Sequence, residues 1–575
     1  MDSLHQPNST VLTDFRNEYN ADGNRIQHVA SHAITHTAIS KVLVKSKRAD
    51  ELHAAFSDEL DVDTKISDQQ QSGRCWIFSF LNVLRAHFVH EYELPSEFEF
   101  SQAYLFFWDQ FEKSNQFLKY IWELKDEPSD HPVVRELLKD PISDGGQWHM
   151  LQNLVSKYGI VPKHCMSESK QANATDKMNT LLSAKLREYA HHLRTRHVSN
   201  LEDTLRPMLF DIYSLLCVCL GEPPKTIRWE YTPSSQNFMK RKFKKHYHKR
   251  KMAKQQGTHS SKHTSQHAGS KRHSSSNSKH RPSPSKQTVQ EVPLHTPTHI
   301  DKKPFEESKE FTPLDFYKEF VHVPIDEYVT VINYPHPDRP FHRRFQVKYL
   351  NNMVGGRESE LHNLPIEDLK QIAIRAIDAG EPVWFCADVG KDCSIRYGIL
   401  DPDVLDYRTV FSSDPHGWDK GLRMEYKEGI PSHAMAFRGY HVPSKPDDTP
   451  TKPSHTVHRK RSSRSSNHTR KSKKTRASSH SKKKTKGGHR PQTKSKTESV
   501  AMEKTARKQP SRWLVENSWG DFVGKNGNLV MSDAWFDRHV YEIAVHKRHL
   551  LKPPDKKPVI KLEMWDVFGS LFTLR

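Results

Sequence analysis

The chain has 575 residues, of which 35% are hydrophobic and 27% are charged, and its net charge is +20. Its apolar fraction is below the ~45–50% of ordinary globular proteins, and no apolar run approaches the ~18–20 residues that cross a bilayer, which argues against a membrane protein. Six cysteines without paired spacing and a first segment without basic and apolar signal regions argue against a secreted, disulfide-bonded protein and favour a reducing, intracellular compartment.

The positive charge lies in two segments. Residues 239–290 hold 15 Lys and Arg and residues 451–497 hold 17, and neither segment contains Asp or Glu. Together they carry 32 positive charges, more than the net +20 of the whole chain, so the remaining residues have a net charge of −12. Both segments have almost no apolar content, which predicts disordered insertions in an otherwise acidic body.

The first 60 residues have helical periodicity, and three histidines fall on one predicted helical face. His28, His32 and His36 follow one another at a spacing of four residues. That spacing suits a metal site. Because no acidic or cysteine ligand joins the pattern, an exposed helical face is the preferred interpretation, and no metal is expected.

Further along the chain, helical patterns precede strand patterns. Helices are predicted from Cys75 to about residue 88, over 100–125, and over 366–379 with a C-cap at Gly380. Strands are predicted at 383–387, 434–437, 513–517 and 528–531. This order favours an α+β fold with helices and strands in separate regions.

A cysteine stands at the start of the first long apolar helix. Ser72-Gly73-Arg74 precede Cys75, and a helix N-terminus favours an anion, which predicts a lowered thiol pKa and a nucleophilic thiolate. The alternative is a buried structural cysteine, the commonest state of an intracellular Cys.

Two later segments supply partners for such a nucleophile. His433 enters one predicted strand, and Asn517 leaves another, followed by Trp519 and Gly520. A cysteine nucleophile needs a base, and the base needs an orienting group. Cys, His and Asn in this chain order form such a set.

The sequence resembles the bleomycin hydrolase subgroup of the papain-like cysteine peptidases. The members of this subgroup are cytosolic aminopeptidases. The resemblance covers nearly the whole chain outside the basic segments. The matching stretches are residues 72–79, 144–148 (Asp-Gly-Gly-Gln-Trp), 223–226, 352–357 (Asn-Met-Val-Gly-Gly-Arg), 433–435 and 515–520.

The resemblance implies a role for each matching position. Cys75 would be the nucleophile, His433 the general base and acid, and Asn517 the group that orients the imidazole. Gln69 would donate to the oxyanion, and Trp519 would shield the bond between Asn517 and His433. The chain departs from the family in reading Gln-Gln-Gln at 69–71, which leaves the oxyanion donor open to a neighbouring residue.

The resemblance also implies how substrate is held and selected. Gly145 and Gly146 would lie along the substrate backbone, where small residues permit close approach. The C-terminal arm, ending at Leu574 and Arg575, would enter the cleft and place its carboxylate near the substrate's free amine. A homohexamer, peptide substrates with a free N-terminus and no cofactor beyond a reduced thiol are also implied.

The expected architecture is a papain-like two-lobe cysteine peptidase, with a helical lobe and a β-barrel-like lobe. The segments are an N-terminal helical extension (1–60), the helical lobe with Cys75 (61–238), a basic insertion (239–300), a helical addition and the start of the β lobe with His433 (301–443), a second basic insertion (444–510), the end of the β lobe with Asn517 (511–563) and the C-terminal arm (564–575). His433 and Asn517 are 84 residues apart because the second insertion separates them.

The basic insertions leave a second function open, nucleic-acid binding on a peptidase scaffold. Clustered Lys and Arg suit phosphate contacts to DNA or RNA, while the near absence of aromatic residues argues against base stacking. The resemblance implies some nucleic-acid affinity as well. The alternative is a pair of solvated loops with a nuclear-import signal such as residues 471–476. The expected location is therefore cytoplasmic, with a nuclear pool as the second possibility.

Overall fold

The structure is a computed structural model that describes residues 9–62, 64–229, 309–443 and 507–566. The chain divides into one unit made of residues 1–442 and 510–575 and another made of residues 443–509. All the helices and strands of the described residues belong to the first unit. Both predicted basic insertions fall, apart from residues 507–510, outside the described residues.

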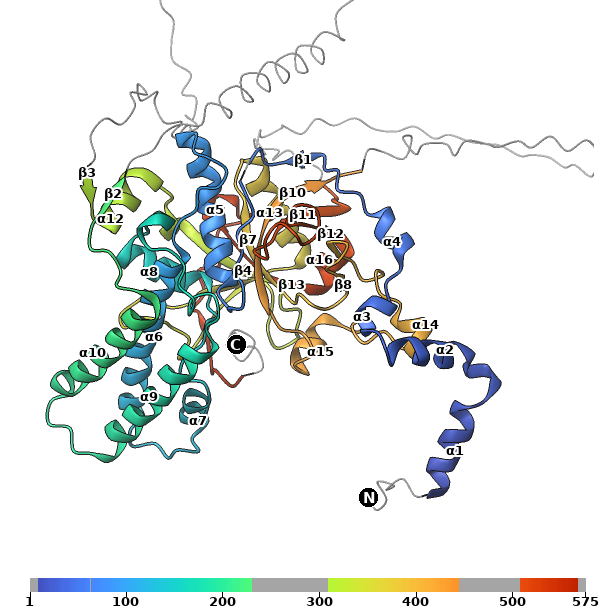
Figure 1. Cartoon of the computed structure of the whole chain (residues 1–575), viewed down its shortest axis with the longest axis horizontal. Coiled ribbons are helices and arrows are strands. Elements are labelled where there is room, and N and C mark those ends of the chain that lie inside the picture. Colours follow the sequence, from blue (N-terminus) through green and yellow to red (C-terminus); the bar gives the residue numbers. More distant parts are fainter. Residues whose placement is uncertain (1–8, 63, 230–308, 444–506, 567–575) are drawn as a thin grey trace, which may run out of the picture. The chain divides into compact units, whose positions relative to one another are not determined.

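Helices fill the first part of this unit. Their bounds are α1 Ser9–Tyr19, α2 Arg25–Ile34, α3 Ile39–Val42, α4 Ser46–Glu51, α5 Cys75–Tyr92, α6 Gln102–Glu123, α7 Pro132–Lys139, α8 Trp148–Tyr158, α9 Asp176–Thr195, α10 Leu201–Leu220, α12 Pro313–Phe316, α13 Ile366–Asp378, α14 Tyr407–Phe411, α15 Lys420–Glu425 and α16 Asp533–His539. In Figure 1, α5 runs between the other long helices and the strands.

Strands follow later in the chain. Their bounds are β1 Asp58–Glu59, β2 Ile227–Trp229, β3 Lys309–Phe311, β4 Tyr328–Ile332, β5 Arg343–Val347, β6 Leu361–Asn363, β7 Val383–Ala387, β8 Cys393–Ser394, β9 Ile399–Leu400, β10 His433–His441, β11 Arg512–Glu516, β12 Asn528–Ser532, β13 Val540–His546 and β14 Ile560–Leu562. Within the described residues, β2 and β3 pair with each other, and the others form one mixed sheet in the order β14-β5-β6-β4-β13-β7-β10-β11-β12-β9-β8, with β1 beside β10.

Successive side chains of the central strands point to opposite faces of the sheet, and each face packs into a different hydrophobic core. On β7, Trp384 and Cys386 face the core that contains α5, α6 and α8, while Val383 and Phe385 face the core under α13. Because successive side chains of a strand point to opposite faces, both faces of this strand are buried, which explains why it reads as a continuous apolar run.

The predicted helices and strands are confirmed within a few residues. Helix α5 begins at Cys75, and α13 ends at Asp378, shortly before Gly380 in the left-handed region at φ 87°. The three predicted histidines divide between α2, which contains His28 and His32, and the turn that holds His36. Among the described residues, no group of His, Cys, Asp and Glu could hold a metal ion.

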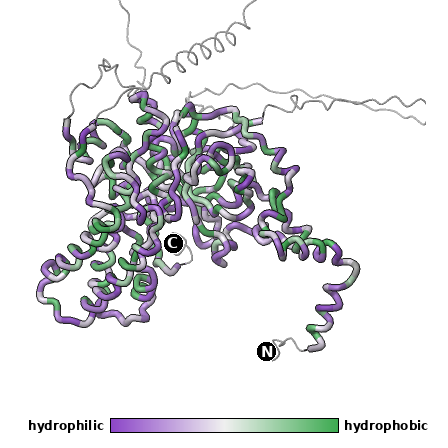
Figure 2. The backbone as a smooth tube through the Cα atoms, viewed as in Figure 1, coloured by the Kyte–Doolittle hydropathy of each residue, from purple (hydrophilic) through white to green (hydrophobic). Residues whose placement is uncertain are grey.

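The helices of the described residues contain no candidate for a membrane span. Figure 2 shows hydrophilic and hydrophobic residues mixed along the described part of the chain. Helices and a large mixed sheet are present together, which agrees with the expected class of mixed α and β structure.

Candidate active site

The nucleophile candidate lies where a glycine-containing loop enters α5. The N–H of Gly73 donates to Asp144 Oδ2 at 2.9 Å, and a Cβ at Gly73 would lie 2.8 Å from the Cβ of Asp144. Glycine therefore permits the close approach that leads the chain into the helix at Cys75. Asp144 is fixed in turn by Asn179, whose Nδ2 donates to Asp144 Oδ1 at 2.5 Å.

The structure brings the other two candidates to the same place. Strand β10 packs against α5, and the N–H of Ala434, next to His433, lies 3.5 Å from Cys75 Sγ. Strand β11 is the antiparallel neighbour of β10, and Asn517 follows its last residue. Asn517 Oδ1 lies 2.8 Å from His433 Nε2.

A second hydrogen bond fixes the tautomer of His433. The N–H of Ser518 donates to Asn517 Oδ1 at 2.8 Å. Since a backbone N–H only donates, the shared side-chain atom must be the amide oxygen, which only accepts. His433 Nε2 therefore carries the proton, and the lone pair of the neutral ring is on Nδ1.

Trp519 covers this pair on one side. Its ring centroid lies 4.7 Å from that of His433, with the planes inclined at 32°. Asn517 is 1% exposed. The hydrogen bond between Asn517 and His433 is thus kept away from water, which strengthens it.

The Gln69 side chain is buried beside the same loop, whereas Gln70 and Gln71 are exposed. Its Nε2 donates to the Ser72 carbonyl at 2.7 Å, and its Oε1 accepts from Ser518 Oγ at 2.7 Å. Of the three consecutive glutamines, Gln69 is therefore the one attached both to the Cys75 loop and to the segment after Asn517. Ser518 and Asp144, which hold these loops, were not predicted as site residues, although both lie within the motifs that carry the resemblance.

The expected lowering of the Cys75 pKa is wrong for this arrangement. Burial raises the pKa of the Cys75 thiol to about 11, although the backbone N–H groups of Ala434, Trp76 and Cys75 itself act in the opposite direction. Burial lowers the pKa of His433 to about 4, and the hydrogen bond to Asn517 acts against that shift. For the Cys75 pKa, desolvation exceeds the effect of these backbone N–H groups, and for the His433 pKa it exceeds the effect of the Asn517 hydrogen bond.

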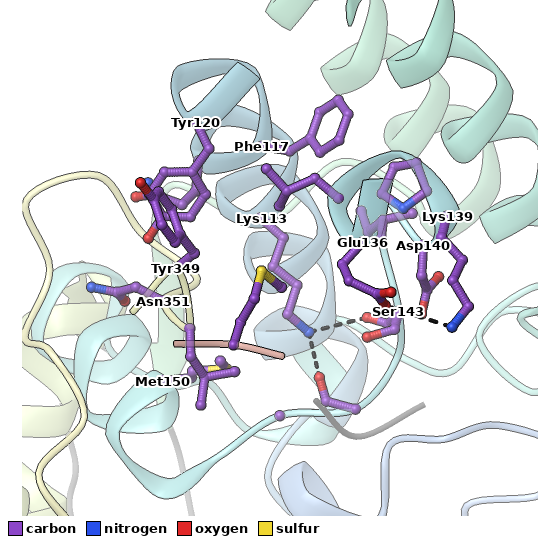
Figure 3. Close-up of a pocket in the computed structure, with 18 of the residues that line it drawn as sticks. Lys113, Phe117, Tyr120, Glu136, Lys139, Asp140, Ser143, Met150, Tyr349 and Asn351 are labelled. Atoms are coloured by element: carbon purple, nitrogen blue, oxygen red, sulfur yellow. Dashed lines mark hydrogen bonds and ion pairs between the residues drawn. The ribbon is translucent and has the colours of Figure 1, made fainter. Parts of the chain in front are cut away.

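A cavity of about 760 Å³ adjoins the site (Figure 3). Gly145 and Gly146 line it together with Ser432, which precedes His433. A Cβ on Gly146 would lie 2.6 Å from the Trp76 ring, so any larger residue there would displace the indole. Met564 and Trp565 line the same cavity, while Leu574 and Arg575, the predicted end of the arm, lie outside the described residues.

A buried thiol, a neutral imidazole of fixed tautomer and an amide that orients it form the site of a cysteine peptidase. The model of the Peptidase C1-like family matches residues 8–256, 298–453 and 490–569, and the chain belongs to that family.

Two relatives and one solved structure show which cysteine peptidases the chain is similar to. The chain is 31% identical to the bleomycin hydrolase of Rattus norvegicus over 88% of this chain and 86% of that protein. It is 31% identical to the aminopeptidase C of Listeria monocytogenes over 90% and 89% of the two chains. The crystal structure of PepW from Lactobacillus rhamnosis matches with a TM-score of 0.70 and 28% identity, covering 98% of this chain and 99% of that one. The resemblance found in the sequence is confirmed, and the chain is a cysteine-type aminopeptidase.

Proposed function

We propose that the enzyme removes N-terminal residues from peptides, with Cys75 as nucleophile, His433 as base and acid, and Asn517 as the orienting group. The observation that carries this proposal is the pair of hydrogen bonds on Asn517 Oδ1. They leave the His433 Nδ1 lone pair free to take a proton, on a strand that contacts Cys75 Sγ through Ala434.

The reaction follows from these groups. The thiol proton passes to His433 Nδ1 as sulfur attacks the scissile carbonyl, so that two opposite charges form together rather than one alone in a buried site. The tetrahedral intermediate collapses when His433 protonates the leaving amine, which gives an acyl-enzyme. Water then attacks the acyl carbon while His433 takes its proton. The second tetrahedral intermediate collapses by breaking the C–S bond, which releases the amino acid, and the His433 imidazolium returns its proton to the Cys75 sulfur. These steps need a reduced thiol and no cofactor.

Gln69 supplies the oxyanion donor in this proposal. One N–H of its amide is used by the Ser72 carbonyl, which leaves the second for the developing oxyanion beside the N–H of Cys75. A donor of this kind contributes about 3–4 kcal/mol to transition-state stabilisation.

Selection of a free N-terminus is assigned to the C-terminal arm. Met564 and Trp565, the first residues of the predicted arm, line the cavity beside Gly145 and Gly146. A terminal carboxylate in the cavity would attract the protonated amine of the substrate's N-terminal residue. It would also block peptides that extend further on the N-terminal side of the scissile bond. Removing residues 567–575 is expected to permit cleavage of N-acetylated peptides, and unchanged specificity would contradict this role.

A homo-oligomer, expected to be a hexamer, is supported by the N-terminal helices. Helices α1 and α2 expose large apolar side chains, namely Leu12, Phe15, Tyr19, Ile26 and Val29. Apolar side chains grouped in this way are typical of surfaces that another subunit covers. Sedimentation of the whole chain against a variant without residues 1–24 tests this, since loss of the oligomer is expected only in the variant.

The decisive test of the proposed reaction uses a fluorogenic aminoacyl amide and its N-acetylated analogue. The wild type should hydrolyse the first and spare the second. Cys75→Ala should abolish turnover, and His433→Ala should reduce it by about 10³-fold or more. Turnover by Cys75→Ala at more than a trace level would contradict the assignment.

The basic insertions support a second function, binding of DNA or RNA. Residues 239–290 and 451–497 within them hold 32 positive charges without a single Asp or Glu, and such segments release counterions when they meet phosphates. Deleting residues 239–290 and 451–497 should abolish salt-dependent binding to DNA while leaving hydrolysis of the aminoacyl amide unchanged. The same binding after deletion would contradict this second function. The enzyme is expected in the cytoplasm, and a nuclear pool would require these segments.

A further inference from the structure

A partly buried lysine on α6 contacts the backbone of the glycine segment. Lys113 Nζ lies 2.6 Å from Asp109 Oδ2, 3.0 Å from the carbonyl of Ser143 and 2.6 Å from the carbonyl of Gly145. Lys113 lines the cavity, and Figure 3 shows dashed lines from its ammonium to the segment. An ammonium has three N–H groups, and three acceptors occupy them, so Lys113 is suited to hold the protein backbone rather than to bind a ligand itself.

Asp109, in turn, is held by a residue from a distant part of the chain. Asp109 is fully buried, and its Oδ1 accepts a hydrogen bond from Asn352 Nδ2 at 3.1 Å. Asn352 belongs to the Asn-Met-Val-Gly-Gly-Arg run that the proposed reaction leaves without a role. The Nδ2 of Asn153 on α8 lies 3.3 Å from Asn352 Oδ1, and the N–H of Arg357 donates to Asn153 Oδ1 at 2.7 Å. Residues 352–357 therefore hold the Asp109 carboxylate in place, and this carboxylate in turn holds the Lys113 ammonium.

The contact at Gly145 determines the direction of a peptide group. Because the peptide unit is planar and trans, holding the Gly145 carbonyl towards Lys113 turns the N–H of Gly146 to the opposite side. The Trp76 ring, 2.6 Å from where a Cβ of Gly146 would lie, closes one side of the segment. Trp76 is itself held by its Nε1, which donates to the carbonyl of Asp144 at 2.6 Å.

We propose that Lys113 is a positioning residue for substrate binding, which orients the Gly145–Gly146 peptide so that it can hydrogen-bond an extended peptide backbone in the cavity. Asp109 and Asn352 hold Lys113 in place. The proposal rests on the proposed function, in which this segment lies along the substrate.

The test separates positioning from folding by means of paired variants. Lys113→Met removes the ammonium and leaves Asp109 buried without its partner, which destabilises the fold. The double variant Asp109→Asn/Lys113→Met removes both charges and retains an amide oxygen for Asn352, so its melting temperature should return towards that of the wild type. Lys119→Met is the matched control, because Lys119 is a half-exposed lysine of the same helix whose ion pair with Glu123 spans 3.7 Å.

The measurements are KM and kcat for a peptide with a free N-terminus, together with the rate at which iodoacetamide alkylates Cys75. The double variant should raise KM by up to roughly tenfold, the loss expected when a backbone hydrogen bond to the substrate is misaligned, with kcat and the alkylation rate close to wild type. Asp109→Asn alone should raise KM less, since Lys113 keeps both carbonyls. Lys119→Met should match the wild type.

Two outcomes overturn the proposal. A double variant with the KM of the wild type shows that Lys113 does not position the segment. A double variant whose KM, kcat, alkylation rate and melting temperature all change together shows a structural role only. Failure of the proposed function is distinct from both, because the wild type itself would then fail to hydrolyse the peptide.

Discussion

The most informative single substitution is Asn517→Ala. Truncation removes the one oxygen that accepts from both His433 Nε2 and the N–H of Ser518, each at 2.8 Å. Both donors are buried, and a buried donor without a partner costs about 1–3 kcal/mol. The free energy of unfolding should therefore fall by about 2–4 kcal/mol.

Activity should fall for a separate reason. Without Asn517 the imidazole of His433 is free to rotate and to exchange tautomers, so Nδ1 no longer faces the thiol as a lone pair in most molecules. A wrong tautomer at this position costs several orders of magnitude in comparable triads, and we expect kcat/KM to fall by roughly 10²-fold or more. KM should change little, because Asn517 is not assigned a contact with substrate.

Urea denaturation measures the first effect, and hydrolysis of a fluorogenic aminoacyl amide measures the second. The control is Asn528→Ala on the neighbouring strand β12, whose side-chain Nδ2 contacts only the Asn526 carbonyl at 3.3 Å among the hydrogen bonds of the described residues. The orienting role of Asn517 is refuted if Asn517→Ala keeps more than a third of wild-type kcat/KM while folded, or if the control loses as much.

Three further outcomes are expected. Burial lowers the pKa values of four histidines, His149, His433, His539 and His549, to about 4. Between pH 6.5 and 4 the unfolded chain therefore binds more protons than the folded chain, so stability to urea should fall as the pH drops through that window. A flat stability profile over this range would contradict the expectation. Burial raises the pKa of Glu542 to about 8, so Glu542→Gln should stabilise the protein at pH 8 by about 2–4 kcal/mol and little at about pH 3, where the side chain is protonated in both states. An equal effect at both pH values would exclude desolvation as the cause. Trp519→Ala should admit water to the Asn517–His433 bond and lower kcat/KM about tenfold, whereas Trp418→Ala, at an exposed indole, should leave it unchanged.

Much of the fold could be predicted because local patterns are strong here. The apolar run from Cys75 predicts α5, and the run at 383–387 predicts β7, since both elements are buried on nearly all sides. The association of Cys75, His433 and Asn517 could be predicted only through the chemistry that joins them and through the resemblance, because they lie up to 442 residues apart in sequence.

Other features depend on tertiary contacts that no local pattern reveals. Burial raises the pKa of the Cys75 thiol, and part of its surroundings is β10, whose Ala434 N–H contacts the sulfur from 359 positions away in sequence. Asp109 and Lys113 have the spacing of an exposed ion pair on a helix, yet Asp109 is fully buried and Asn352 completes its hydrogen bonding from 243 residues away. Polar residues on a helix predict solvent exposure on average, so such a network is invisible until the fold is known.

Cys75 is the proposed nucleophile, and that role is tested most simply by following alkylation and activity together. The enzyme is treated with iodoacetamide for increasing times, its remaining hydrolysis of an aminoacyl amide is measured, and the modified cysteines are located by peptide mass mapping. Loss of activity should follow modification of Cys75 in equal proportion, while modification of Cys165, Cys217, Cys219, Cys386 or Cys393 should not correlate with it. Full activity in enzyme whose Cys75 is completely alkylated would contradict the claim.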